Sequence, residues 1–114
     1  MKFSVYYKLL ERDAYFEKFF RREKRKINEK CIELAEEQYR DLLELIASYI
    51  LTGDRLSLSV ILTRQNSKIA KKFFDHFTNS DTLHMSKAAI VQRINEFFDG
   101  VNTNENYTRI CEGT

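Results

Sequence analysis

The chain contains no proline and only three glycines among its 114 residues. A typical sequence of this length would carry roughly six prolines and eight glycines. Proline breaks the interior of a helix and glycine weakens it, so their scarcity favours long helices. Hydrophobic residues make up 43% of the chain and nine residues are phenylalanine, which is enough apolar material for one folded core. We therefore expect a single all-α domain over residues 1–101.

The longest amphipathic pattern runs from residue 13 to residue 51. Its apolar residues recur mostly at spacings of three, four and seven, which is typical of one buried helix face. A single helix of this length would extend roughly 60 Å. A break near residues 26–28 is the alternative, because Asn28 can cap a second helix. The pattern therefore predicts either one long rod or a helical hairpin, ending at Gly53. The stripe comprises Phe16, Phe19, Phe20, Ile27, Cys31, Leu34, Ala35, Tyr39, Leu42, Ile46, Tyr49 and Ile50.

Three shorter helices are expected after residue 53, separated by clusters of polar turn residues. The apolar run at 56–62 is short enough for either a helix or a buried strand, and its helical neighbours favour a helix. The expected caps are Asp54, Asn66 or Ser67, and Ser86, with a final stop at Asp99-Gly100. The chain should thus form a small bundle of four to five helices. Residues 102–114 are polar and are expected to form a loose tail.

The start of the chain allows two interpretations. Residues 3–9 alternate between apolar or aromatic side chains and more polar ones, which is typical of a short strand. The same residues could form a first turn of helix that continues into Leu10. Both interpretations remain open from the sequence alone.

Three Phe-Phe pairs recur on amphipathic segments, at residues 19–20, 73–74 and 97–98. One interpretation is an aromatic surface that stacks on a ligand. The other is that the second phenylalanine widens the buried stripe, since aromatic side chains dominate core energetics. The second interpretation requires nothing beyond folding, so we expect these pairs in the core.

Charge is divided into zones along the chain. Residues 12–30 carry eight cations and four anions, and residues 33–44 carry one cation and five anions. Residues 64–93 carry six cations and two anions. Two basic zones thus flank an acidic zone. Such zoning is evidence about association rather than about fold.

The first basic zone contains cations that repel one another. On a helix, Arg21 and Arg25, and likewise Arg22 and Lys26, are neighbours at a spacing of four, and each like-charged pair costs a few tenths of a kcal/mol. These cations lie opposite the apolar stripe, so they are expected to be exposed. The excess favours an acidic partner, and the alternative is a solvated helix face with no partner. Candidates are the acidic segment 33–44 of a second copy, in an antiparallel homodimer, and a phosphate backbone.

The second basic zone resembles a helix-turn-helix unit over residues 67–98. Residues 67–73 resemble its positioning helix, and residues 86–94 resemble a capped recognition helix. About nine residues separate the two helices, where the tight motif uses three or four. The resemblance implies a non-enzymatic, DNA-associated regulatory protein whose binding weakens with salt. The expected phosphate contacts are Arg21, Arg22, Lys24, Arg25, Lys26, Lys71 and Lys72, and the expected base-edge contacts are Ser86, Lys87, Gln92 and Arg93.

The alternative function is a helical adaptor, chaperone or inhibitor that binds another protein. Such a protein would carry apolar side chains outside the core stripes, where tyrosine is favoured for its apolar body and polar tip. The candidates are Tyr6, Tyr7, Tyr15, Leu43, Leu45 and Val91. An exposed aromatic patch away from the basic zones would favour this alternative.

Other chemistry has little support in the sequence. His76 and His84 lack ligand-forming neighbours and are expected to be ordinary surface histidines, so we expect no metal, cofactor or small-molecule substrate and no enzymatic activity. Cys31 lies on the apolar stripe and is expected to be buried. No segment has the apolar length of a membrane span or a secretion signal. We therefore expect a cytoplasmic protein in which Cys31 and Cys111 are free thiols.

Overall fold

The computed structural model describes the backbone of residues 3–112 and the side chains of residues 7–100. Within that range the chain forms six α-helices and three short 3-10 turns. The helices are α1 (Phe3–Leu10), α2 (Arg12–Glu23), α3 (Ile32–Thr52), α4 (Arg55–Thr63), α5 (Lys68–Thr78) and α6 (Lys87–Glu112). The turns are η1 (Lys24–Lys26), η2 (Glu29–Cys31) and η3 (Thr82–His84). The expected small all-α bundle is confirmed, with one helix more than the four to five predicted.

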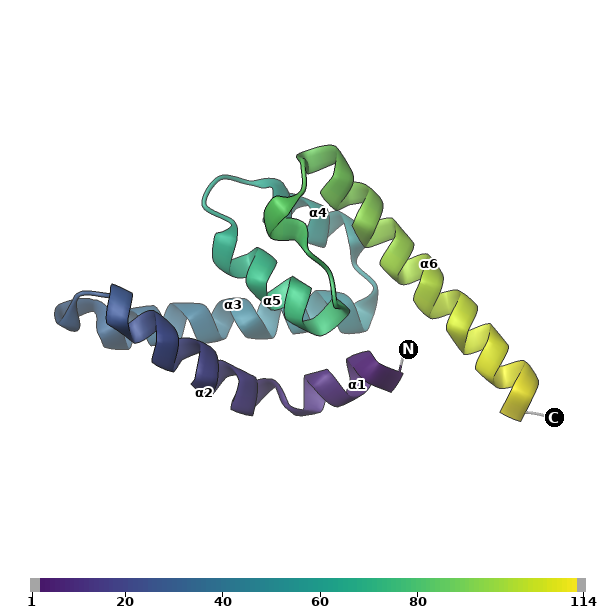
Figure 1. Cartoon of the computed structure of the whole chain (residues 1–114), viewed down its shortest axis with the longest axis horizontal. Helices are drawn as coiled ribbons and strands as arrows, with labels where there is room; N and C mark the ends of the chain where they lie inside the picture. Colours follow the sequence, from purple (N-terminus) through teal and green to yellow (C-terminus); the bar gives the residue numbers. More distant parts are fainter. Residues whose placement is uncertain (1–2, 113–114) are drawn as a thin grey trace.

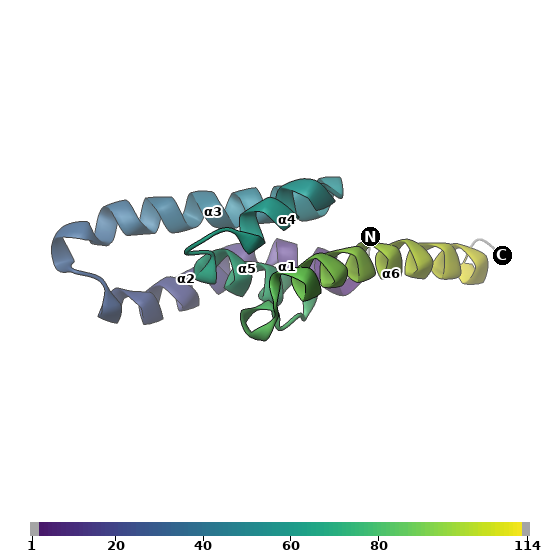
Figure 2. The ribbon, with the colours of Figure 1, turned by 90° about the horizontal axis from the view of Figure 1, so that it is seen from above.

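The helices form an elongated body with a hairpin at one end and a projecting helix at the other (Figures 1 and 2). Its principal extents are 57 × 30 × 20 Å. The hairpin is α2 and α3, and the helix at the opposite end is α6. Between them, α5 packs against α3 and α1, while α4 packs against α3, α5 and α6. Helix α5 is therefore the central element of the bundle.

The core is built around phenylalanine, as the recurring pairs predicted. All six members of the three Phe-Phe pairs are buried. Rings from α2 and α5 meet edge to face, with 4.8 Å between the centroids of Phe19 and Phe73. Leu43 of α3 and Leu58 of α4 are fully buried in the same core. The prediction that these pairs serve the core is confirmed.

The strand considered for residues 3–9 does not form, because these residues belong to helix α1. A lone strand would leave its backbone groups without ladder partners, and no strand lies elsewhere in residues 3–112. A helix satisfies them internally, and the amide of Glu11 donates to the carbonyl of Tyr7 over 3.0 Å. Leu9 is buried against the bundle while Leu10 is 64% exposed. The alternating pattern was therefore a misleading signal.

The long pattern from residue 13 to residue 51 is a hairpin rather than a rod. The break falls at residues 24–31, and the Asn28 side chain accepts a hydrogen bond from the Lys30 amide over 3.2 Å. Because the turn interrupts the helical periodicity, Cys31 lies exposed in η2 as a free thiol. The prediction that Cys31 is buried is therefore wrong. The side chain of Cys111 lies outside the described residues.

Ion pairs hold the two arms of the hairpin together. Arg12 of α2 lies 3.1 Å from Glu44 of α3, and Arg40 of α3 lies 3.2 Å from Asp13 of α2. The Arg40 guanidinium also lies 4.1 Å from the ring centre of Phe16, which adds a cation–π contact. Of these pairs, Arg12–Glu44 joins the basic zone to the acidic segment within one chain. A homodimer stays a prediction.

The two glycines with predicted stop roles behave differently. Gly53 has φ +70° and ends α3, since a left-handed residue closes the last turn of a helix. Gly100 does not adopt a positive φ, and the helical backbone of α6 continues through it to Glu112. The predicted stop at Asp99-Gly100 is therefore wrong, because glycine ends a helix only where it turns left-handed. The side chains of the expected loose tail, 102–114, lie outside the described residues.

Candidate functional site

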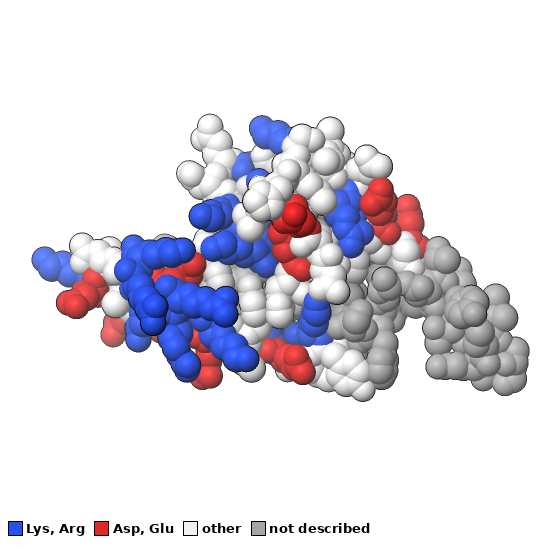
Figure 3. All heavy atoms as spheres, viewed as in Figure 1, with Lys and Arg blue, Asp and Glu red and all other residues white. Residues whose placement is uncertain are grey.

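Two neighbouring hollows lie on the side of the molecule formed by α2, α5 and η3. Figure 3 shows Lys and Arg side chains gathered over α2 and over the start of α5 on this side. Six cations line the two hollows, and Leu83 lines both. We call this surface the basic face. Its cations are Lys18, Arg22 and Lys72 at the first hollow, and Arg64, Lys68 and Lys71 at the second.

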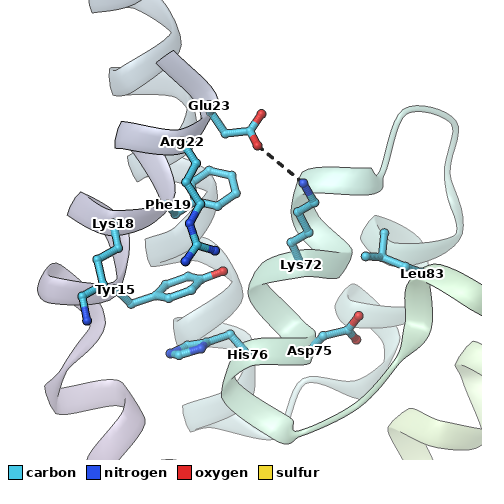
Figure 4. A pocket seen from close by; sticks show the side chains of 9 residues that line it. All are labelled: Tyr15, Lys18, Phe19, Arg22, Glu23, Lys72, Asp75, His76 and Leu83. Carbon is cyan, nitrogen blue, oxygen red and sulfur yellow. Dashed lines mark hydrogen bonds and ion pairs between the residues drawn. The ribbon is translucent and has the colours of Figure 1, made fainter. Parts of the chain in front are cut away.

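The first hollow has a volume of about 420 Å³ and lies between α2 and α5. Figure 4 shows side chains from both helices converging on it. Tyr15 and His76 stack within it, with ring centroids 3.6 Å apart and an interplanar angle of 9°. Lys18 and Arg22 approach from the α2 side. The hollow thus combines flat aromatic surface with positive charge.

The aromatic pair is held uncharged. Burial raises the pKa of Tyr15 to about 12. Burial, with a smaller contribution from the charge of Lys8, lowers the pKa of His76 to about 4. His76 Nε2 is buried and has no hydrogen-bond partner among the described side chains. At neutral pH the charge of this hollow therefore comes from the surrounding lysine, arginine and carboxylate groups.

A buried carboxylate ties the two walls of the first hollow together. Glu23 is only 8% exposed, and its Oε1 lies 3.5 Å from Lys72 Nζ (Figure 4). The same oxygen lies 3.6 Å from Lys26 Nζ. Lys72 Nζ also lies 5.9 Å from the ring centre of Phe19. Lys72, predicted as a phosphate contact, is therefore committed to a bridge between α5 and α2.

The second hollow has a volume of about 460 Å³ and lies at the start of α5. Leu83 lines both hollows and is 37% exposed. The position of Leu83 is set by its neighbour Thr82, whose amide and hydroxyl both donate to Asp75 Oδ1, over 2.9 and 2.6 Å. Thr82 is fully buried. Leu83, which lines both hollows, therefore lies in a turn that is anchored to α5.

The structure brings together only part of the predicted contact set. Arg22 and Lys72 line the first hollow and Lys71 lines the second. The other four predicted phosphate contacts are exposed on α2 and η1, as predicted. They are Arg21, Lys24, Arg25 and Lys26. In the described part of the chain, only Lys26 of these four forms an ion pair.

The predicted base-edge residues have structural partners instead. Ser86 Oγ accepts from the amide of Ala89 over 3.2 Å and so caps α6 as expected. Gln92 donates to Glu96 over 3.1 Å. Arg93 donates to Ser80 Oγ over 2.9 Å and to the Thr78 carbonyl over 3.2 Å, which places a cation at the C-terminal end of α5. Lys87 is exposed at the start of α6.

Helices α5 and α6 differ from the tight helix-turn-helix arrangement. They are joined by residues 79–86, which include η3. Helix α6 packs mainly on α4, where Arg55 donates to Asn95 over 3.1 Å and to Asp99 over 2.7 Å. The basic face therefore draws on α2 and α5, which are distant in sequence, rather than on α5 and α6.

The predicted contact set lacked several residues that line the first hollow, among them Glu23, His76 and Leu83. Tyr15 was named only as a candidate for protein binding. His76 was expected on the surface and is instead partly buried against Tyr15, while His84 is exposed as expected. Glu23 follows Phe19 by four residues, so helical spacing places this carboxylate on the apolar face, a signal that could have found it. The hollow itself depends on contact between α2 and α5, and no local pattern encodes that contact.

The residues proposed for protein binding are divided by the structure. Leu43 is fully buried, so its assignment to the surface is wrong. Tyr7, Leu45 and Val91 are 49%, 40% and 39% exposed. The side chain of Tyr6 lies outside the described residues. Two larger apolar exposures, Leu56 at 76% and Val60 at 60%, lie one turn apart on α4.

Comparison of the chain with protein-family models, curated proteins and solved structures finds no match. In the described residues, no group of three or more His, Cys, Asp or Glu side chains could hold a metal ion. No helix in that part of the chain combines the length and apolar character needed to cross a membrane.

Proposed function

We propose that this chain is a non-enzymatic, DNA-associated regulatory protein that binds the phosphate backbone with its basic face. The observation that carries the proposal is an excess of positive charge. Six cations line the two hollows, against the two carboxylates of Glu23 and Asp75, and only Lys72 of the six forms an ion pair among the described residues. Cations in excess over carboxylates raise the local positive potential, which attracts a polyanion.

The proposal differs from the helix-turn-helix interpretation in the surface it uses. The hydrogen bonds of Ser86, Gln92 and Arg93 within the chain leave few free groups at the start of α6. Arg22, by contrast, is exposed and lines the first hollow. Phosphate binding through α2 and α5 is therefore favoured over base reading by α6.

The test is the affinity for a labelled 20-nucleotide DNA, measured by fluorescence anisotropy from 50 to 200 mM salt. About four phosphate contacts predict a loss of affinity on the order of 100-fold across this range. Arg22→Glu should weaken binding at least tenfold, while Lys87→Glu, with the same change of charge on α6, should change it less than twofold. Affinity that is independent of salt, or equal losses in both variants, would overturn the proposal.

The second candidate function is protein binding, and the observation that favours it is the apolar pair on α4. Leu56 and Val60 are the most exposed large apolar side chains on that helix, and exposed apolar surface is typical of an interface. A second copy of the chain is the simplest partner. Sedimentation velocity over a concentration series should then show a dimer that Leu56→Ser/Val60→Ser dissociates. A monomer at all concentrations would exclude self-association through α4.

A further inference from the structure

We propose that the basic face prefers single-stranded DNA to duplex DNA, with an unpaired base entering the first hollow beside Leu83. This inference rests on the proposed function and names the form of nucleic acid that the site takes. It depends on the shape and lining of the hollows, whereas the proposed function depends on charge alone.

The first step concerns shape. A volume of about 420 Å³ falls within the range of roughly 300–1,000 Å³ that is typical of small-molecule sites. A duplex presents a convex row of phosphates and keeps its bases stacked inside, so it would contact the rim and leave the hollow empty. A single strand can turn its bases outward into such a space.

The second step concerns the lining. The first hollow offers an uncharged Tyr15–His76 stack and the partly exposed side chain of Leu83. Apolar and aromatic groups of this kind contact a base but gain nothing from a phosphate. The Arg22 guanidinium, which is planar, can stack on a base or pair with a phosphate.

The third step concerns continuity between the hollows. Leu83 lines both of them, so a strand with a base in the first hollow reaches the second by crossing this side chain. There it meets Arg64, Lys68 and Lys71, which can neutralise the next phosphates. Alternation of apolar surface and cations is the arrangement that single-strand binding grooves use. The Asp75 and Glu23 carboxylates also line the first hollow, which disfavours a phosphate there and favours a base.

The experiment compares three 20-nucleotide ligands at the same salt concentration: a single strand, a duplex, and an abasic single strand. The abasic strand keeps the phosphates and removes the bases. The single strand should bind at least tenfold more tightly than either of the others. Duplex binding equal to or tighter than single-strand binding, with salt dependence intact, would overturn this inference and leave the proposed function standing. Absence of binding to all three would overturn both.

A matched pair of substitutions that leave the charge unchanged tests the contact of Leu83 with the single strand. Leu83→Ser should weaken single-strand binding about fivefold and leave duplex binding unchanged, because it removes apolar contact without altering charge. Leu56→Ser, on the exposed side of α4, is the control and should change neither. If Leu83→Ser weakened single-strand and duplex binding equally, the inference would be wrong. The inference would also be wrong if polyglutamate carrying the same total charge displaced the single strand completely. Circular dichroism melting verifies that each variant is folded.

Discussion

His76 is a histidine that folding keeps neutral. Its ring stacks on Tyr15, and its Nε2 is buried without a partner among the described side chains. Burial, assisted by the charge of Lys8, lowers its pKa from 6.5 to about 4. The unfolded chain therefore takes up a proton below about pH 6.5, while the folded chain resists protonation until about pH 4. The stabilising contribution of His76 is complete above pH 6.5 and declines as the pH falls toward 4.

Replacement of this histidine by phenylalanine should make stability less dependent on pH. In His76→Phe the new side chain keeps a ring against Tyr15 and has no proton to gain. The free energy of unfolding, measured by urea titration at pH 7.5, 6.0 and 4.8, should therefore fall less steeply toward acid than it does in the wild type. His84→Gln is the matched control, since the His84 side chain is 79% exposed, and it should keep the wild-type slope. An unchanged slope in His76→Phe would contradict the assignment.

We expect Glu23 to have opposite effects on the stability of the fold and on the proposed DNA binding. Its carboxylate contacts Lys72 and Lys26, so Glu23→Gln should destabilise the fold by about 1 kcal/mol. The same change removes a negative charge from the first hollow and releases Lys72, so DNA affinity should rise several-fold. Thermal melting and anisotropy measure the two effects. Glu37→Gln on the exposed acidic side of α3 matches the charge change and should produce neither effect, and a loss of affinity in Glu23→Gln would refute this role.

At the scale of the helices, the two glycines form a natural comparison. A Cβ added at either position meets nothing within 4 Å, so packing does not distinguish them. Gly53→Ala should destabilise by about 1 kcal/mol, because alanine is strained at φ +70°. Gly100→Ala should stabilise α6 by up to about 1 kcal/mol, because alanine has the higher helix propensity. Chemical denaturation measures the free energy of unfolding of both variants. Equal changes in this free energy would show that the backbone conformation of the glycine does not determine the effect of the substitution.

The helices themselves were largely predictable because local signals encode them. Ser86 caps α6 as predicted, Asn28 caps the turn η2 that precedes α3, and the Phe-Phe pairs lie in the core. Two predictions failed because they relied on a local sequence pattern, whereas the structure at those residues depends on other parts of the chain. Cys31 follows the helical period but falls in a turn, and the alternation at residues 3–9 had no strand to pair with.

The hollows were less predictable from the sequence than the helices. All six of their cations belong to the two basic zones, but the pairing of α2 with α5 depends on packing between residues that are 49 positions apart, such as Glu23 and Lys72. The Glu23–Lys72 bridge and the placement of Leu83 exist only through that packing. Charge zoning therefore predicted the cations of the basic face, whereas the shape and the aromatic lining of its hollows required the tertiary structure.

On the scale of the whole molecule, the basic face spans two separate parts of the bundle. Helix α2 belongs to the hairpin at one end, while α5 is the central helix (Figure 1). A single DNA strand that occupied both hollows would contact α2, α5 and η3. A ligand that binds the folded state and not the unfolded chain stabilises the fold by mass action. Binding at this face should therefore be visible as global stabilisation.

We predict that a single-stranded 20-mer at 100 times its dissociation constant raises the melting temperature by roughly 10 °C. Binding at that concentration contributes about 2.7 kcal/mol, and a domain of this size shifts by about 4 °C per kcal/mol. Differential scanning fluorimetry at 50 mM salt measures the shift, which should largely disappear at 500 mM salt because phosphate contacts are screened. Arg22→Glu, if it binds tenfold more weakly, should lose about half of the shift at the same strand concentration, while Lys87→Glu should retain it. Because the strand would stabilise the folded state only by binding to it, a full shift in Arg22→Glu would place the contact outside the basic face.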